Sequence, residues 1–281
     1  RVIKIPDGWH ALAHSSNGVI AAMSNEDQSI VATQFHPEVS HTEEGKLFLN
    51  NFLFKIANCS PNWTAENFIE EQIEIIRNQV KDDKVIVGVS GGVDSTVVAA
   101  LLHKAIGDQS TAILIDHGML RLNEATNCVK ALKDGLGVNI HCYDESEIFL
   151  KKLEGVTDPE KKRKIIGNQF IYSFDKIANE LGDIKYLSQG TLYPDIIESG
   201  VSKGKSAHVI KSHHNVGGLP DDMNFQLIEP LRELFKDEVR NIGRELGLPN
   251  ALIDRHPFPG PGLAVRIIGE ITKERIDILQ K

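Results

Sequence analysis

The stretch that decides the fold of this chain covers residues 85–96 and runs Val85-Ile86-Val87-Gly88-Val89-Ser90-Gly91-Gly92-Val93-Asp94-Ser95-Thr96. Its first residues are apolar and rich in β-branched side chains, which predicts a short buried strand. Two glycines then form a tight turn, and the largely apolar run over 97–104 predicts a helix. Gly91 and Gly92 lack a Cβ atom, so they can take positive φ angles and bring backbone N–H groups close to an anion. The helix start adds unpaired N–H donors and a partial positive charge, so the stretch predicts a phosphate-binding loop.

The polar side chains of this loop indicate which kind of phosphate loop it is. Hydroxyl groups can add further donors, and the Gly-Lys-Ser/Thr ending of a Walker A loop is missing from the sequence. Residues 90–95 instead resemble the pyrophosphate-binding loop of the N-type ATP pyrophosphatases, which split ATP between the α and β phosphates. This resemblance implies an adenine nucleotide alpha hydrolase-like fold and assigns ATP and pyrophosphate to Ser90, Gly91, Gly92, Val93, Asp94, Ser95 and Thr96. The alternative is a glycine turn without a ligand.

Composition limits the class of protein. The length of 281 residues suggests about two domains, and 31 basic against 39 acidic residues give a net charge of −8. This acidic balance disfavours a broad nucleic-acid surface, and no apolar run is long enough to cross a membrane. Three cysteines without metal-binding spacing predict reduced thiols in a cytoplasmic protein. The chain opens without methionine and stops inside a helical pattern, so we expect a piece of a longer protein.

Strands and helices alternate through most of the chain. Besides the opening strand we predict strands over 110–116, 138–142 and 184–188, with helices from about residues 64, 123, 145 and 159. Short connections between these elements predict an α/β fold with a doubly wound parallel sheet, whose ligands lie beyond the carboxyl ends of the strands. Asp116 lies at such an end and is a candidate for the ATP site. A turn that Asp116 caps is an equally good interpretation.

The first 58 residues contain short predicted strands. Asn17-Gly18 between apolar runs predicts a hairpin turn, residues 29–35 predict another strand, and Thr42 is predicted to cap a helix. His36 and Glu38 lie two residues apart at the end of that strand, so they share a face and the carboxylate can orient the imidazole. A structural histidine in a surface loop is the alternative.

The segment Gln34-Phe35-His36-Pro37-Glu38 and the helix after it resemble the end of a class I glutamine amidotransferase domain. In that family the His and Glu serve a cysteine nucleophile that releases ammonia from glutamine, so the resemblance makes His36 and Glu38 catalytic. The cysteine of that family lies on a Gly-x-Cys-x-Gly turn, which this sequence lacks, and Cys59 lies in a predicted linker. Only part of a catalytic triad can therefore be assigned.

Two further segments favour a second ligand. Basic residues crowd the first turns of the helix predicted from Pro159, where they oppose the helix dipole. Either an anionic partner or a solvated charged face would explain them. Residues 191–220 surround a flexible glycine-containing loop and predict a lid over bound nucleotides. Within it, Asp195 and Glu198 are candidates for binding Mg²⁺ or a nucleotide hydroxyl, and Lys211 for neutralising phosphate charge.

The segment over 255–266 is rich in proline and glycine and, by itself, predicts a connector between domains. The order of amidotransferase end, pyrophosphatase loop, lid and Pro-Gly segment resembles the glutamine-hydrolysing GMP synthetases. This resemblance implies three regions. Residues 1–58 end an amidotransferase domain, residues 59–250 form the ATP pyrophosphatase domain, and residues 251–281 begin a dimerisation domain.

The same resemblance implies an activity. The C2 oxygen of xanthosine monophosphate (XMP) attacks the α phosphate of Mg·ATP, pyrophosphate leaves into the loop, and ammonia displaces AMP to give GMP. The resemblance assigns XMP to Arg163, Glu198 and His213, catalysis to Asp195 and Lys211, and Mg²⁺ to Asp94 and Asp195. It also implies a homodimer without nucleic-acid or membrane partners. Two hypotheses stand beside it: a tRNA-modifying pyrophosphatase, which needs reactive cysteines and a basic surface, and a nucleotide-binding fragment without turnover.

Overall fold

The structure is a computed structural model that describes residues 2–198 and 225–281. Its contacts divide the chain into two compact units, the first ending at Thr64 and the second beginning at Ala65. We describe each unit by itself. None of the helices in these ranges is long and apolar enough to span a bilayer.

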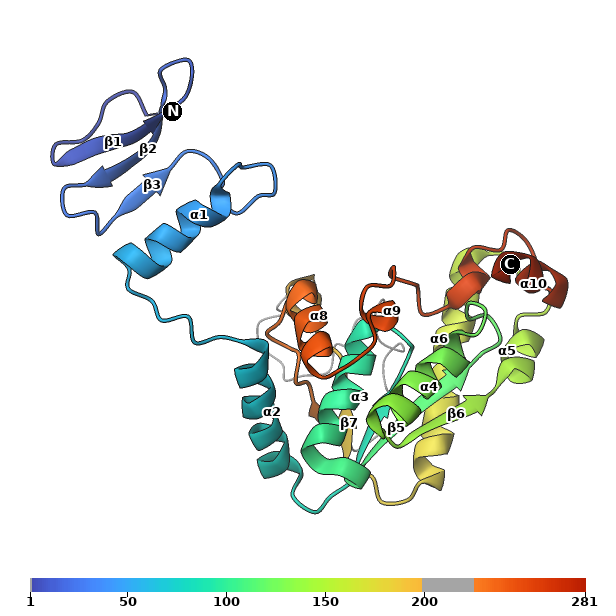
Figure 1. Cartoon of the computed structure of the whole chain (residues 1–281). Coiled ribbons are helices and arrows are strands. Elements are labelled where there is room, and N and C mark those ends of the chain that lie inside the picture. The colour runs from blue at the N-terminus through green and yellow to red at the C-terminus, as the bar shows by residue number, and fades with distance from the viewer. Residues whose placement is uncertain (1, 199–224) are drawn as a thin grey trace. The chain divides into compact units, whose positions relative to one another are not determined.

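The first unit holds a small antiparallel sheet and one helical segment (Figure 1). Strands β1 (Trp9–His14), β2 (Ile20–Asn25) and β3 (Val31–Thr33) pair in that order. The hairpin predicted at Asn17-Gly18 is confirmed, with Gly18 at a φ of 76° that suits glycine. The strand predicted over 29–35 is shorter than expected.

Helix α1 (Gly45–Asn50) continues into a wider π-helical stretch, η1 (Asn51–Ile56). The cap predicted at Thr42 is wrong, because the helix begins three residues later. Glu44 stands at the N-cap position in a left-handed conformation and gives no side-chain cap. The Thr42 hydroxyl instead donates to the carbonyl oxygen of His36 at 2.6 Å, which closes the loop between β3 and α1.

The second unit is built on a parallel five-stranded sheet, as the sequence predicts. The order across the sheet is β6 (Ile140–Asp144), β5 (Ser110–Asp116), β4 (Val85–Gly88), β7 (Tyr186–Ser188) and β8 (Gln226–Ile228). The chain runs outward from β4 to β6 and then returns to β7 on the other side of β4. The carboxyl end of β4 therefore lies at the topological switch point, where doubly wound sheets bind ligands.

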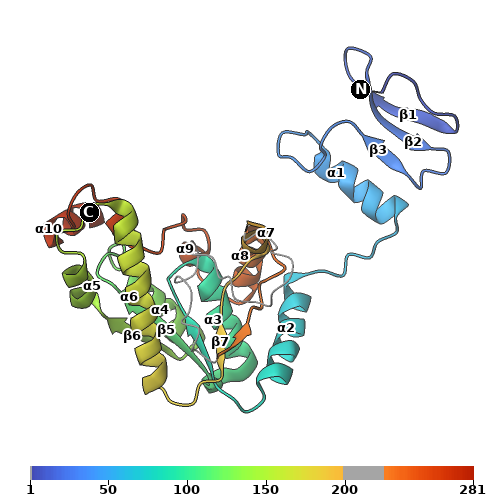
Figure 2. The ribbon, with the colours of Figure 1, turned by 180° about the vertical axis from the view of Figure 1, so that it is seen from behind.

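Helices cover both faces of this sheet, as Figures 1 and 2 show. Residues of β4 alternate between the two cores: Val85 and Val87 face one, and Ile86 faces the other. Full burial of each such side chain stabilises the fold by about 1.5–3 kcal/mol. One face carries α2 (Ala65–Val80), α3 (Val93–Ile106), α4 (Glu124–Leu136), α8 (Lys236–Glu245) and α9 (Asn250–Ile253). The other carries α5 (Ser146–Lys152), α6 (Pro159–Glu180), the 3₁₀ turn η3 (Gly262–Val265) and α10 (Lys273–Gln280).

The starts of α6 and β6 show how residues close in sequence determine where a helix or strand begins. Asp158 caps α6 by accepting from the backbone N–H of Lys161 at 2.8 Å, with Pro159 at the first helical position, which confirms the predicted start. The strand predicted over 138–142 begins two residues late. Gly137, at a φ of 73°, and Val138 still donate to carbonyls of the last turn of α4, so both belong to the helix end.

Candidate nucleotide site at the carboxyl ends of the strands

The phosphate loop connects β4 to α3 in a compact turn. Gly91 has a φ of 73°, and Gly92 stands at the N-cap of α3 without a side-chain cap on the helix. The first-turn N–H groups therefore remain available for an anion. The Ser90 and Ser95 hydroxyl oxygens lie 3.3 Å apart, and Ser95 Oγ also accepts from the Ser90 N–H at 3.2 Å.

Two of the predicted loop residues serve the fold. Thr96 is buried, and its hydroxyl donates to the carbonyl oxygen of Gly92 at 2.7 Å. Val93 packs its side chain into the core beneath α3. Their contribution to an anion site is therefore the backbone. The side-chain hydroxyls that remain are those of Ser90 and of Ser95, and the Ser95 hydroxyl also makes a longer contact with the Gly92 carbonyl oxygen at 3.2 Å.

Gly190 brings a second strand end against this loop. A Cβ atom placed there would lie 3.1 Å from the Cβ of Asp94 and 3.2 Å from the backbone nitrogen of Ser95. Only glycine allows the segment after β7 to approach the start of α3 this closely. The sequence places residues 189–191 at a strand end, but the tight contact depends on the sheet order.

Asp94 and Lys236 form an ion pair at the edge of the loop. Lys236 Nζ lies 2.5 Å from Asp94 Oδ2, and the Asp94 Oδ1 atom is buried without a hydrogen-bond partner among the described residues. Sequence analysis missed Lys236. A signal was present, because a lysine in the first turn of α8 opposes the helix dipole, as the basic residues of α6 do.

Asp195 and Asp116 both make local hydrogen bonds. Asp195 Oδ2 accepts from the backbone N–H of Leu192 at 2.9 Å, which secures the start of the short helix α7 (Tyr193–Glu198). Asp116 Oδ1 accepts from the N–H of Gly118 at 2.8 Å, which is the turn-capping interpretation of this residue. No group of three His, Cys, Asp or Glu residues in the described ranges has the arrangement of a metal site. Mg²⁺ bound with nucleotide phosphates needs only one or two carboxylates, and the unpartnered Asp94 Oδ1 fits that role.

The basic run at the start of α6 divides between interior and solvent. Lys162 is fully buried, and its Nζ donates to the carbonyl oxygens of Ala264, Ile267 and Gly269 at 3.3, 2.7 and 2.6 Å. Burial, aided by Arg275, lowers its pKa below that of an ordinary lysine. Arg163 is exposed and pairs with Glu160 at 3.2 Å.

Three predicted residues of the lid cannot be placed. Lys211 and His213 lie outside the described residues, as does the lid from residue 199 onward. Glu198 is the last residue of α7, and its side chain is likewise outside the description.

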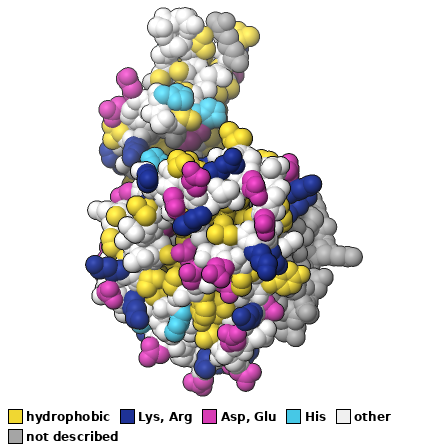
Figure 3. Space-filling view, turned by 90° about the vertical axis from the view of Figure 1, so that its right-hand side faces the viewer, with side chains coloured by type: hydrophobic (Ala, Val, Ile, Leu, Met, Phe, Trp, Pro, Cys, Tyr) yellow, Lys and Arg dark blue, Asp and Glu magenta, His cyan; other side chains and the backbone are white. Residues whose placement is uncertain are grey.

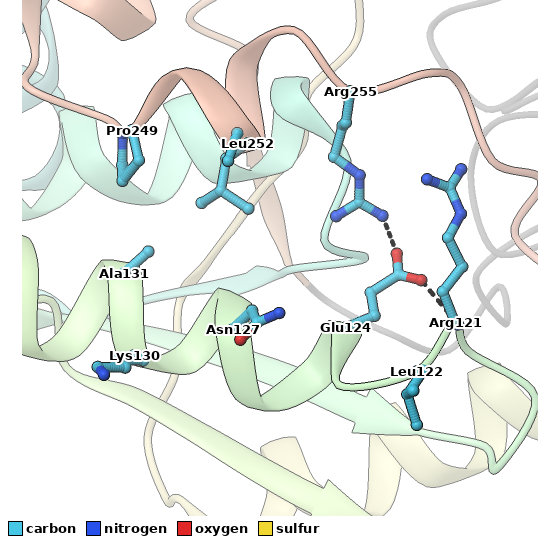
Figure 4. Close-up of a pocket in the computed structure, with 10 residues that line it drawn as sticks. Arg121, Leu122, Glu124, Asn127, Lys130, Ala131, Pro249, Leu252 and Arg255 are labelled. Atoms are coloured by element: carbon cyan, nitrogen blue, oxygen red, sulfur yellow. Dashed lines mark hydrogen bonds and ion pairs between the residues drawn. The ribbon is translucent and has the colours of Figure 1, made fainter. Parts of the chain in front are cut away.

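A pocket of about 370 Å³ lies beside the loop, between α4 and the segment that carries α9 (Figure 4). Arg255 and Glu124 meet at its inner end, with Glu124 also accepting from the backbone N–H of Arg121 at 2.9 Å. The Arg121 guanidinium lies 4.2 Å from the ring centre of Phe258 and donates to the carbonyl oxygen of His256 at 3.0 Å. The Pro-Gly segment is thereby attached to the turn after β5.

In the first unit the predicted pair is assembled. His36 Nδ1 lies 2.7 Å from Glu38 Oε1, and both side chains are exposed. The backbone N–H of Glu38 and the His36 ring together hold the pKa of this carboxyl below its ordinary value. The contact orients the imidazole, as the two-residue spacing predicts, but the pair lies in the loop after β3 rather than within a strand.

Comparisons with known proteins match the two units of the chain to two different families. The family model "Glutamine amidotransferase class-I" matches residues 1–56, and the model "NAD synthase" matches residues 64–169. "GMP synthase [glutamine-hydrolyzing]" of Teredinibacter turnerae is 55% identical over 281 residues, covering 100% of this chain and 54% of the relative. The chain is similar to the GMP synthases along its whole length.

Another GMP synthase, from Lactobacillus delbrueckii subsp. bulgaricus, is 56% identical over 279 residues, covering 99% of this chain and 53% of the relative. This chain thus spans about half the length of the curated GMP synthases it matches. Among solved structures, NMN synthetase from Francisella tularensis has a TM-score of 0.53 at 16% identity, covering 78% of this chain and 86% of its own. NAD⁺ synthetase from Burkholderia pseudomallei has a TM-score of 0.52 at 16% identity, covering 79% and 82%. These structures share the pyrophosphatase-type fold that the loop motif predicts.

Proposed function

We propose that this chain belongs to a GMP synthase, a carbon–nitrogen ligase of purine biosynthesis that uses glutamine as its nitrogen source. The observation that carries the proposal is the 53–56% identity to GMP synthases over 279–281 residues of this chain. A match to the loop alone would not identify the substrate, because pyrophosphatase loops occur in enzymes with many different substrates. The identity extends through the amidotransferase end, the loop and the Pro-Gly segment.

The proposed reaction runs in two chemical steps. The C2 oxygen of XMP attacks the α phosphate of ATP, the bond between the α and β phosphates breaks, and pyrophosphate leaves. Ammonia then attacks C2 and displaces AMP, which gives GMP and releases a proton. Adenylation is needed because the C2 oxygen is otherwise a poor leaving group.

The loop is suited to the first step. Charge accumulates on the leaving pyrophosphate, and the start of α3 has no side-chain cap, while the Ser90 and Ser95 hydroxyl oxygens lie 3.3 Å apart in the same loop. Preorganised donors of this kind stabilise a transition state without reorganisation. Lys236 adds a positive charge beside the loop. Mg²⁺, when bound with ATP, would neutralise phosphate charge, and Asp94 is the carboxylate we assign to it, with Asp195 as the second candidate.

The remaining assignments follow the family resemblance. We infer that the lid contributes Lys211 for phosphate charge and His213 for XMP, that Glu198 and Arg163 contact XMP, and that Asp116 lies at the adenosine pocket. The exposed position of Arg163 leaves its guanidinium available for a phosphate at little cost, because an exposed pair with Glu160 is worth only about 0.2–1 kcal/mol.

Glutamine hydrolysis requires a cysteine nucleophile in addition to the His36–Glu38 pair. This sequence contains no Gly-x-Cys-x-Gly turn that would supply it. Ammonium ion therefore replaces glutamine as nitrogen donor for this chain in the proposed assay.

We also propose a cytoplasmic homodimer that forms through the C-terminal region. The exposed apolar side chains of Ile268, Ile278 and Leu279 support such an interface. No nucleic-acid partner is expected. Over the face in Figure 3, Lys and Arg side chains of the second unit interleave with Asp and Glu instead of forming a basic stripe.

The test is release of pyrophosphate by the purified chain with Mg·ATP, XMP and ammonium, each omitted in turn. We expect pyrophosphate, AMP and GMP in equal amounts, only when all three are present. Turnover that ignores XMP would overturn the substrate assignment. Nucleotide binding without turnover would support the inactive-fragment hypothesis.

A further inference from the structure

The carbonyl group of Gly91 is held from outside the phosphate loop. Arg255 Nη1 donates to the Gly91 carbonyl oxygen at 2.6 Å, although the two residues are 164 positions apart. The other terminal nitrogen of the same guanidinium pairs with Oε1 of Glu124. The Arg255 and Glu124 side chains are only 14% and 4% exposed. A buried guanidinium with both terminal nitrogens engaged, one by a carbonyl and one by a carboxylate, is held in a defined orientation.

We propose that Arg255, held by Glu124, is a positioning residue that aims the Gly92 N–H at the leaving pyrophosphate. This inference rests on the proposed function and names a further residue for the same loop. It concerns orientation and not charge, because the carboxylate of Glu124 neutralises the guanidinium.

The geometry of the peptide bond gives the reason. A peptide unit is planar and trans, so its C=O and N–H point in opposite directions. Gly91 and Gly92 share one such unit, and both residues are glycines that tolerate several orientations of it. Once Arg255 holds the Gly91 carbonyl on one side, the Gly92 N–H must point to the other side, where the Ser90 and Ser95 hydroxyls lie.

The Gly92 N–H makes only a long contact inside the loop. Its nitrogen lies 3.4 Å from Ser90 Oγ, near the limit for a hydrogen bond. A phosphate oxygen is a stronger acceptor, so this donor is available to a ligand. Without Arg255 the peptide unit is free to rotate, and each rotation that turns the N–H away removes one donor from the site.

Glu124 is itself fixed. Its second oxygen, Oε2, accepts from the backbone N–H of Arg121 at 2.9 Å, so the carboxylate is anchored in the turn before α4. Figure 4 shows the resulting chain of contacts from Arg121 through Glu124 to Arg255. The orientation of the loop thus depends on two segments that lie far from it in sequence.

The experiment measures the affinity of the full chain for Mg²⁺–pyrophosphate by titration calorimetry, beside its affinity for AMP. We expect Arg255→Met to weaken pyrophosphate binding at least tenfold, and Arg255→Lys to restore part of it. AMP binding should change less than twofold, because AMP lacks the phosphates that the loop holds. A general loss of structure would weaken both ligands.

The matched control is Arg244→Met. Arg244 lies in α8 and pairs at 2.6 Å with Asp254, the residue before Arg255. That ion pair is exposed and does not contact the loop. Its loss should leave pyrophosphate binding within twofold of the parent.

A second variant addresses the risk that removing one buried charge prevents folding. Arg255→Met combined with Glu124→Met removes both charges, which proteins tolerate better than an unpaired one. The double variant should fold, and its affinity for pyrophosphate should again be at least tenfold lower than that of the parent chain. The Gly92 amide resonance of ¹⁵N-glycine-labelled protein should move on pyrophosphate addition in the parent and not in this variant.

Parent-like pyrophosphate binding in both Met variants would overturn the inference and leave the proposed function intact. The expected binding pattern without XMP-dependent GMP formation would overturn the proposed function and leave the positioning role standing. A parent chain that does not bind pyrophosphate would overturn both.

Discussion

The phosphate loop and the start of α6 are both predicted from sequence to bind phosphate. The structure shows that their charged side chains differ in what they contact. At the loop, charges from distant segments converge, with Lys236 on Asp94 and Arg255 on Gly91. At the start of α6, Lys162 points inward to backbone carbonyls and Arg163 points outward to Glu160. Successive helical residues are about 100° apart, so the neighbouring members of a charge run cannot all face one ligand. A run of basic residues is therefore weaker evidence for a site than convergence of separate segments.

The largest expected effect tests the loop side of this comparison. Lys236→Met should lower XMP-dependent pyrophosphate release by roughly a hundredfold to a thousandfold, because it leaves the negative charge of Asp94 unneutralised beside the leaving group. Steady-state kinetics with saturating ammonium measure this. Lys273→Met is the control, since Lys273 pairs with Asp277 in α10. Equal rates for the two variants would remove Lys236 from the proposed site.

On the α6 side the expected effect is on stability. Lys162→Met leaves three carbonyl oxygens, two of them buried, without their donor and should lower the free energy of unfolding of the second unit by about 3 kcal/mol. Urea unfolding measures the change. Lys161→Met and Lys164→Met, at exposed neighbours, should change it by less than about 0.5 kcal/mol. If all three substitutions cost the same, Lys162 does not serve the fold.

The contribution of a second buried ionisable group, His117, to the stability of this unit can be measured by changing the pH. This buried ring follows β5 and packs edge-on against Phe170 of α6. Burial lowers its pKa from 6.5 to about 4, against the opposing effect of Asp116. The unfolded chain therefore binds a proton more readily, and the stabilisation present above pH 6.5 is lost as the pH falls toward 4. The loss should reach about 3 kcal/mol.

Urea unfolding at several pH values between 7 and 4 measures this slope, with His117→Gln as the comparison. The variant should lack this part of the pH dependence. An unchanged slope in the variant would show that other groups cause it.

Two glycines give the smallest effects and opposite signs. Gly190→Ala places a Cβ atom against Asp94 and Ser95, and should destabilise the second unit by about 1–3 kcal/mol while weakening pyrophosphate binding. Gly167 lies within α6, and apart from its own helix turn no atom of the described residues lies within 4 Å of a Cβ added there, so Gly167→Ala should stabilise the second unit by about 0.5–1 kcal/mol. Thermal melting and calorimetry measure both. Destabilisation by Gly167→Ala would contradict the helical environment described.

Much of this architecture could be predicted from short stretches of sequence. The alternation of apolar runs with helical patterns predicts the parallel sheet, because buried strands and capped helices depend on neighbours in the chain. The glycine turn over 90–92 and the Asp158 cap are local for the same reason. The positions missed, such as the start of α1 and of β6, are those where loop contacts or a helix end compete with the pattern.

Local sequence was enough to predict the backbone elements of the site: a strand, two glycines and a helix start, whose first-turn N–H groups have no partner within the helix. Tertiary structure decided which side chains complete it. Lys236, Gly190, Arg255 and Glu124 reach the loop only because the sheet order places β7 beside β4 and because α4, α8 and α9 share one face. Such contacts join residues as much as 164 positions apart, and no local pattern specifies them. The burial of Lys162 also depends on tertiary structure, because its Nζ donates to carbonyl oxygens of the segment that packs on α6.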